Sequence, residues 1–264
     1  PAVFPLCLTL IKQGFDVITE KPVVHNLSQA AELCSAVKQF GRKLRICYMK
    51  RFDEGVVQGL HYINNFIAEG DTVRSLDISV HNSGYGGVQI PPHHPRSESN
   101  LERFQASELL PSWLSPELAG SYKWFNNALS HDINLLNMFL KNKSLCVSRS
   151  VLLGNKKVWF EGFADGMRVT FDASETVLRD GWYEEFIFQL ESGLMISIKL
   201  PSPMDISGAA QVSINGALVF PEPGVTTKWA FFHQSNHYKR AISDNSEELT
   251  KDYKLIEDIW THIN

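Results

Sequence analysis

The chain has 264 residues, of which 44% are hydrophobic and 20% are charged, and its formal net charge at pH 7 is −4. This is the composition of a globular protein, and the lack of long runs of like charge argues against nucleic-acid binding. No apolar stretch approaches the roughly 20 residues that a membrane span needs. The four cysteines, Cys7, Cys34, Cys47 and Cys146, form no CxxC pair, which predicts reduced core thiols in a cytoplasmic protein rather than a disulfide or zinc framework.

The amino-terminal stretch "PAVFPLCLTLIKQGF" lacks an initiator methionine and the basic front end of a signal peptide. Its apolar residues can form a short helix that covers a sheet; these residues are Phe4, Leu6, Leu8, Leu10 and Ile11. We therefore expect the chain to begin in the middle of a domain, as a fragment of a longer protein.

The next elements follow the order strand, helix, strand. Residues 16–19 (DVIT) are strand-like, and a helical apolar stripe follows between a candidate N-cap at Asn26 and a stop at Gly41. Residues 43–49 are again strand-like. This spacing predicts a right-handed βαβ unit of a parallel sheet. A second helix is expected over 53–70.

The pattern changes after that helix. Residues 75–82 are strand-like, 83–120 are rich in proline and loop-like, and a helix is expected over 127–141. Closely spaced strands joined by Gly, Asn or Asp turns then predict antiparallel pairing. The expected strands are 145–153, 156–163, 166–173, 182–190, 193–200 and 209–215. Two helices, 232–243 and 246–262, close the chain.

The switch from parallel to antiparallel patterning places a domain boundary near residue 51. Residues 1–51 are expected to end a parallel α/β domain, and residues 52–264 to form a larger α+β domain. A broad open sheet must also cover a second apolar side, which predicts that copies of the chain associate through it.

Lys21 is the first candidate for chemistry. Ligands of open parallel sheets bind beyond the carboxyl ends of the strands, and Lys21 would lie there, with Glu20 beside it and Pro22 fixing the backbone. A lysine in this place can stabilise an alkoxide or position a substrate hydroxyl. The alternative is a solvated lysine at a strand end, and these residues alone favour that alternative.

The second candidate is His131, in the expected helix after residue 127. Helical spacing puts Asn127, His131, Asn134 and Met138 on one face. A separate stripe is wholly apolar and consists of Leu129, Ile133, Leu136 and Leu140. His131 can act as a general base near neutral pH, with Asn127 fixing its tautomer. The alternative is a histidine at the edge of the core that an amide satisfies, and the helix alone favours it.

Other chemistry is not indicated. The adjacent His93 and His94 have no carboxylate or cysteine at ligand spacing, so no metal site is expected. The stretch "SGYGG" (83–87) lacks the GxGxxG phosphate-binding pattern. No GxSxG elbow supports a serine nucleophile.

In this order, the pieces resemble the glucose–fructose oxidoreductase/inositol dehydrogenase family (Gfo/Idh/MocA). "GFDVITEKPVVHNLSQAAEL" is similar to that family's EKP strand and the helix after it, and "CYMKRFDEG" to its next strand. "NNALSHDINLL" resembles the D-x-x-x-H-x-x-D-x-L helix, and "EELTKDYKLIEDIW" the closing helix. The resemblance implies the C-terminal part of a Rossmann domain, then a large open, mostly antiparallel sheet with helices on one face.

The resemblance also implies hydride transfer between NAD or NADP and a sugar-like or polyol substrate. Lys21 matches the EKP lysine, beside the nicotinamide and the substrate, and Glu20 and Pro22 complete that cofactor-contacting motif. His131 matches the histidine credited with proton transfer. In this mechanism His131 takes the hydroxyl proton and Lys21 steadies the oxyanion, while the cofactor takes the hydride.

The chain departs from the family in three places. The opening half of the Rossmann domain, with its glycine-rich loop, is missing, and Val3 occupies the place of a common family histidine. Two family aspartates are Asn127 and Asn134, which can orient an imidazole but offer it no negative charge. The stretch "SYKWF" replaces a glycine-rich approach to the helix. The candidate substrate contacts that rest on chain position alone are Tyr85, Lys123 and Trp124.

Two further functions stay open beside the dehydrogenase. One is a non-catalytic relative that binds a ligand or partner, which the exchange of aspartate for Asn127 motivates. The other is a nicotinamide-dependent glycosidase, in which the cofactor is oxidised or reduced transiently and then restored.

Overall fold

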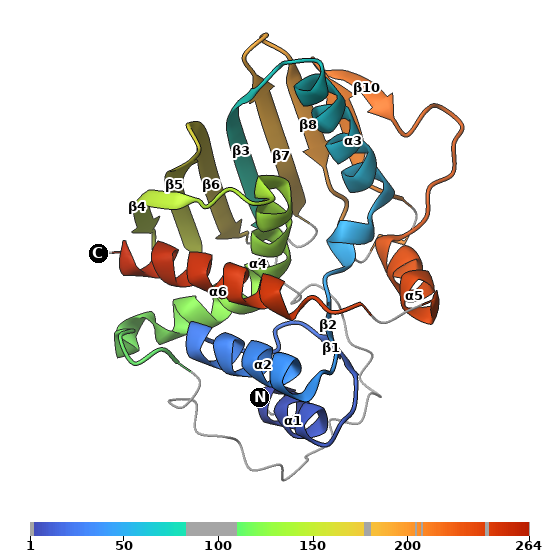
Figure 1. Ribbon diagram of the computed structural model, residues 1–264. Coiled ribbons are helices and arrows are strands. Elements are labelled where there is room, and N and C mark those ends of the chain that lie inside the picture. Colours follow the sequence, from blue (N-terminus) through green and yellow to red (C-terminus); the bar gives the residue numbers. More distant parts are fainter. Residues whose placement is uncertain are drawn as a thin grey trace, which may run out of the picture.

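The structure is a computed structural model that describes residues 3–82, 110–176, 181–203, 205–206, 208–240 and 243–263. A small α/β part lies at one end of the molecule and a large sheet with helices on one face at the other (Figure 1). The expected loop residues Tyr85, His93 and His94 lie outside the described residues.

The helices are α1 (Val3–Lys12), α2 (Leu27–Phe40), α3 (Glu54–Ala68), α4 (Ala119–Leu140), α5 (Ala230–Arg240) and α6 (Ser246–Thr261), with short 3₁₀ helices at Met49–Phe52 and Pro116–Leu118. The strands are β1 (Val17–Glu20), β2 (Leu44–Cys47), β3 (Val73–Asn82), β4 (Cys146–Leu152), β5 (Lys157–Ala164), β6 (Met167–Glu175), β7 (Trp182–Leu190), β8 (Met195–Lys199), β9 (Gln211–Ile214) and β10 (Ala217–Phe220). Within the described ranges, no helix is long and apolar enough to cross a membrane.

The predicted βαβ unit is confirmed. Strands β1 and β2 pair in parallel, from Val17 opposite Leu44 onwards, and α2 is the crossover between them. The side chain of Asn26 caps α2 by accepting a hydrogen bond from the backbone of Gln29, and Gly41 ends the helix at φ 58°. A left-handed conformation of this kind favours glycine, so both ends of α2 follow from local sequence.

The carboxyl-terminal part of the chain closes one edge of this small sheet. The side-chain amide of Asn245 accepts a hydrogen bond from the backbone N–H of Ile46 at 2.8 Å and donates one to the Ile46 carbonyl at 3.1 Å. The Asp244 carboxylate accepts from the backbone N–H of Leu44 at 3.0 Å. These contacts satisfy backbone groups that an edge strand would otherwise expose, and they hold the start of α6 against β2.

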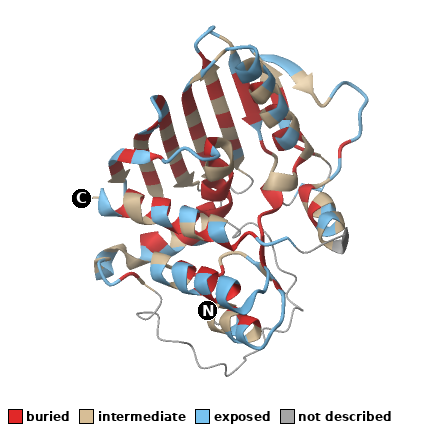
Figure 2. Ribbon diagram, viewed as in Figure 1, coloured by how far each residue is buried: buried red, intermediate tan, exposed pale blue. Residues whose placement is uncertain are grey.

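The large sheet has the strand order β10-β9-β8-β7-β3-β6-β5-β4. Only the β3–β6 pair is parallel among these neighbours, and the rest are antiparallel. Buried and less buried residues alternate along the strands (Figure 2), so one face packs under the helices. The predicted mostly antiparallel open sheet is therefore confirmed.

The outward face of the sheet is not the apolar surface that we expected. On it, Asp77 accepts hydrogen bonds from the Thr170 hydroxyl at 2.5 Å, the Ser75 hydroxyl at 3.3 Å and the Gln189 amide at 3.4 Å. His81 contacts the Ser174 hydroxyl at 2.8 Å. Polar cross-strand pairs, rather than a bare apolar layer, therefore make up much of this face.

Three local expectations need correction. Helix α4 begins at Ala119 rather than at 127, because Pro116 starts a 3₁₀ turn that leads straight into it and Tyr122 is buried there. Strand β10 was not predicted, although Asn215 and Gly216, both at positive φ, form the hairpin turn before it. Of the four cysteine thiols, all are free as predicted, but Cys146 is exposed rather than in the core.

Candidate active site

A cavity of about 490 Å³ lies where the carboxyl end of β1 faces the first half of α4. This size suits a small-molecule ligand. The residues that line it are Val3, Thr19, Glu20, Lys21, Pro22, His25, Leu110, Tyr122, Lys123, Asn126 and Asn127. Five of the predicted site residues are among them, namely Glu20, Lys21, Pro22, Lys123 and Asn127.

Lys21 joins β1 to α4. Its Nζ donates a hydrogen bond to the backbone carbonyl of Asn127 at 2.6 Å. In an α-helix that carbonyl also accepts the backbone N–H four residues on, which belongs to His131, so the ammonium lies one helical turn from the histidine. Burial, and then the positive charge of Lys50, lower the pKa of Lys21 to about 8, against the opposing attraction of Asp132 and Glu20.

His131 is buried on α4, with 8% of its surface exposed. Its ring meets the Tyr48 ring edge-on at 6.1 Å, and its Nδ1 is buried without a hydrogen-bond partner among the described residues. Among the described residues, Asn127 therefore makes no hydrogen bond to Nδ1 that would fix the tautomer of His131. Burial, followed by the charges of Lys21 and Lys50, holds the pKa of His131 well below its usual value. The imidazole is neutral at pH 7.

The structure brings Lys21 and His131 within electrostatic reach of each other, but they do not share one cavity wall. His131 and Trp124 are not among the residues that line the 490 Å³ cavity. Asn134, expected on the His131 face, donates instead to the Asp252 carboxylate of α6 at 2.9 Å. Helix α4 therefore divides its polar side chains between the cavity and the interior.

A buried charge cluster next to this site was not predicted. The Nζ of Lys50 donates to Asp132 Oδ1 at 2.7 Å and to both carboxylate oxygens of Glu184, each at 2.7 Å. Lys50 is 5% exposed, and Asp132 and Glu184 are fully buried. The alternation of residues in β7 could have predicted the cluster. It puts Glu184 on the same inward face as Phe186 and Phe188.

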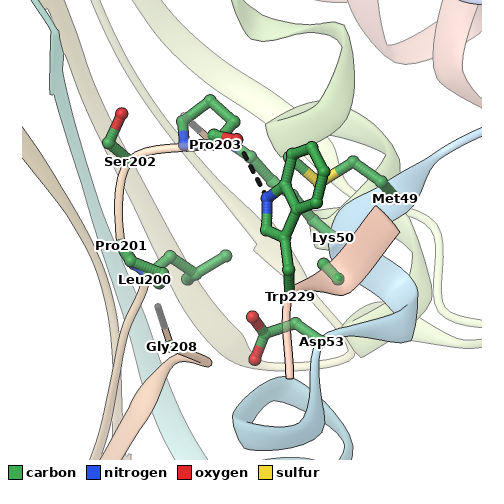
Figure 3. Close-up of a pocket in the computed structure, with 10 residues that line it drawn as sticks. Met49, Lys50, Asp53, Leu200, Pro201, Ser202, Pro203, Gly208 and Trp229 are labelled. Atoms are coloured by element: carbon green, nitrogen blue, oxygen red, sulfur yellow. Dashed lines mark hydrogen bonds between the residues drawn. The ribbon is translucent and has the colours of Figure 1, made fainter. Parts of the chain in front are cut away.

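Lys50 lines another, much smaller cavity. Figure 3 shows it between the 3₁₀ helix after β2 and the turn after β8, with the Trp229 indole donating to the Pro203 carbonyl at 3.0 Å. Its volume of about 10 Å³ is room for one water molecule. The cavity beside Lys21 is the candidate ligand site because five of the predicted site residues line it.

In the described part of the chain, no three His, Cys, Asp or Glu side chains gather in a way that could hold a metal ion. Lys21 and Lys123 give the cavity ammonium groups, and Asn127 gives it an amide. Such a set of groups can bind and polarise a hydroxylated or carbonyl ligand.

No protein-family model and no curated protein sequence matches the chain. Solved structures match its fold. An inositol dehydrogenase homologue from Azotobacter vinelandii, complexed with NADH and myo-inositol, has a TM-score of 0.69 at 11% identity, covering 99% of this chain and 73% of that one. Aldose-aldose oxidoreductase from Caulobacter crescentus, complexed with glycerol, has a TM-score of 0.67 at 17% identity, with the same coverage. GenD2 from gentamicin A biosynthesis, in complex with NAD, has a TM-score of 0.66 at 16% identity, again with that coverage.

At these identities the likeness is one of fold. Over its whole length, the chain has the fold of Gfo/Idh/MocA-type oxidoreductases and corresponds to about 73% of each matched protein.

Proposed function

We propose that this protein is an NAD- or NADP-dependent oxidoreductase of the Gfo/Idh/MocA type that transfers a hydride to or from a sugar-like or polyol substrate. The observation that carries the proposal is the contact of Lys21 with the Asn127 carbonyl in the wall of the large cavity, one helical turn from His131. The fold supports the reaction class, since the matched structures include complexes with NAD, NADH and myo-inositol.

The cavity residues fit the nicotinamide end of such a cofactor next to a small hydroxylated substrate. Apolar walls from Val3, Pro22 and Leu110 suit a flat ring, and the ammonium of Lys21 and the amide of Asn127 suit hydroxyl groups. Glu20, Lys21 and Pro22 would hold the cofactor, which when bound supplies the hydride acceptor or donor.

Two side chains supply the proton chemistry in this proposal. His131 is neutral at pH 7, so it is ready to accept the proton of a substrate hydroxyl. Lys21, with a pKa of about 8, is mainly protonated at pH 7 and can stabilise the oxygen as negative charge develops on it. Because the ammonium loses its proton as the pH rises through 8, this stabilisation falls above that pH.

The test is turnover of NADH and NADPH, or of their oxidised forms, over a panel of sugars, polyols and the matching ketones. We expect Lys21→Ala and His131→Ala each to lower kcat/KM by about 100-fold or more, the size of effect for a group that stabilises charge or transfers a proton. Lys143→Met, which removes an exposed lysine after α4, is the control. Unchanged turnover in both alanine variants would contradict the proposed roles of Lys21 and His131. Net NADH formation would exclude the glycosidase alternative.

Two observations favour the non-catalytic alternative. His131 is buried and does not line the cavity, and the ammonium of Lys21 is already bonded to a helix carbonyl. A protein that only binds its ligand would keep the affinity for that ligand and show no turnover in the same panel. A thermal shift on adding a panel member or NADH, without any activity, would establish this reading.

We also propose that copies of the chain associate through the outward face of the large sheet. Among its polar side chains this face exposes several large apolar or aromatic ones, including Phe163, Tyr183 and Met195, with 49%, 39% and 38% of their surfaces accessible. Mixed surfaces of this kind, with aromatic residues set in a polar surround, are typical of protein interfaces.

A further inference from the structure

If both acids of the buried cluster of Lys50, Asp132 and Glu184 ionise, these three groups together carry one net negative charge. One ammonium faces two carboxyls, and the whole group is at most 5% exposed. An uncompensated charge so deep in the protein is strongly unfavourable. A single proton retained on the two carboxyls would make the cluster neutral.

The hydrogen bonds point to the same proton. An ammonium has three donors, and those of Lys50 are directed at Asp132 Oδ1 and the two oxygens of Glu184. Asp132 Oδ2 is buried and has no donor among the described residues. A proton on Glu184 supplies that missing donor, because a protonated carboxyl can donate one hydrogen bond.

The charged groups around the cluster are few. Lys21 and His131 are close enough for the charge of Lys50 to act on both. Asp53 lines the small cavity with Lys50, but its Oδ1 is committed to the backbone N–H groups of Gly55, Val56 and Ala210. The Trp182 ring also faces the ammonium, with its centroid 5.7 Å from Nζ.

We propose that Glu184 retains one proton at neutral pH and that the cluster holds Lys50 as a fixed positive charge behind Lys21 and His131. Lys50 is thus a positioning residue of the candidate active site, since it acts on the reacting groups through its field and not by touching the substrate. The role of Lys50 as a positioning residue rests on the proposed function, whereas the retained proton of the cluster does not. The raised pKa of Glu184, caused first by burial and then by Asp132, agrees with the retained proton.

The first experiment measures the proton. The folded cluster keeps one proton at neutral pH, whereas the same acids are ionised in the unfolded chain. Unfolding therefore releases this proton and becomes more favourable as the pH rises. We expect the unfolding constant of the wild-type protein, from urea denaturation between pH 6 and 8, to rise about tenfold more per pH unit than that of Glu184→Gln. Equal pH slopes in the two proteins would overturn the retained proton of Glu184.

The second experiment measures the fixed charge without relying on activity. The ¹³Cε shift of Lys21 in lysine-labelled protein should titrate near pH 8 in the wild type and at a higher pH in Lys50→Met. Lys50→Arg keeps the charge and should restore the low midpoint, and Lys143→Met should leave it unchanged. An unaltered Lys21 midpoint in folded Lys50→Met would refute the role of Lys50. If Lys50→Met does not fold, the Lys21 midpoint in Lys50→Arg decides, because a midpoint near that of free lysine contradicts the proposal.

These outcomes are separate from the proposed function. If the protein shows no turnover but gives both expected titration results, the proposal for the cluster stands and the oxidoreductase proposal is wrong. If the enzyme is active but the pH slopes are equal, the oxidoreductase proposal stands and the proposal for the cluster is wrong.

Discussion

Asp252 is a single carboxyl that holds two helices together. It lies on α6 with 2% of its surface exposed and accepts hydrogen bonds from the side-chain amides of Asn134 at 2.9 Å and Asn137 at 2.8 Å, both on α4. Burial raises its pKa to about 7, although the two amides and the Tyr48 hydroxyl favour the ionised form. Desolvation therefore outweighs the hydrogen bonds.

This carboxyl predicts a pH-dependent stability. A folded-state pKa above the unfolded value means that the folded state binds the proton more tightly, so this contribution is complete below about pH 4 and is lost as the pH rises through 7. Asp252→Asn removes the titrating group, and we expect it to reduce the loss of unfolding free energy between pH 5 and pH 8. Urea denaturation at the two pH values measures this.

The matched control is Asp258→Asn, also on α6, which should keep the wild-type difference between pH 5 and pH 8. An Asp252→Asn protein with that same difference would show that Asp252 is ionised throughout this range.

At the scale of single residues, the sequence identifies candidate residues by their type and spacing, but not their partners. Lys21 and the helix of His131 could be found because the "TEKP" stretch and the helical spacing are local. The bond from Asn134 to Asp252 could not, because it joins residues 118 positions apart. The same holds for Lys50 with Glu184, 134 positions apart.

At the scale of elements, Asp53 ties the start of α3 to the segment before β9. Its carboxylate caps the helix by accepting from the backbone N–H groups of Gly55 and Val56, and it also accepts from Ala210 at 2.9 Å. The two backbones come so close that a Cβ on Gly55 would lie 1.9 Å from the Ala210 carbonyl oxygen. Only glycine permits this approach.

We therefore expect Gly55→Ala to lower the free energy of unfolding by about 3 kcal/mol, at the upper end of the cost of overpacking. The clash is with backbone, which cannot rotate away as a side chain can. Gly120→Ala, in the first turn of α4, meets nothing within 4 Å and should be neutral or stabilising by up to about 1 kcal/mol. Urea midpoints compare the two, and equal midpoints would contradict the tight approach.

Elements with local signals were predicted well. Asn26 and Gly41 cap the two ends of α2, and both can be recognised in the sequence. Most strands of the large sheet can be recognised from alternating apolar residues and from the turn residues between them. The start of α4 was missed because Tyr122 gains its burial from an edge-on contact with Trp260 of α6, with ring centroids 5.2 Å apart. That stabilisation depends on tertiary packing and leaves no periodic trace in the sequence.

At the scale of the whole molecule, the sheet has one face under helices and one face outward. The outward face carries ion pairs and hydrogen bonds between strands, such as Arg168 with Asp77 at 3.6 Å, and it also exposes Phe163. This combination leads us to expect a surface that meets another copy of the chain.

We expect Phe163→Asp to weaken self-association, because it buries a carboxylate against a second copy. Sedimentation over a range of concentrations measures the mass. Val57→Asp changes an equally exposed residue on α3, on the other side of the sheet, and should leave the mass unchanged. A wild-type protein that stays monomeric at every concentration would remove the proposed interface.

The sequence by itself determined the βαβ unit, the antiparallel strands, the candidate roles of Lys21 and His131, and the resemblance that joins them. These depend on turn residues, periodicity and short stretches, which act over a few positions. Only the tertiary structure decided that the Lys21 ammonium meets the Asn127 carbonyl, that His131 is buried away from the cavity wall, and that Lys50 lies between two carboxyls. The physical reason is that burial and Coulomb interactions depend on distance in space, and residues far apart in the chain supply both.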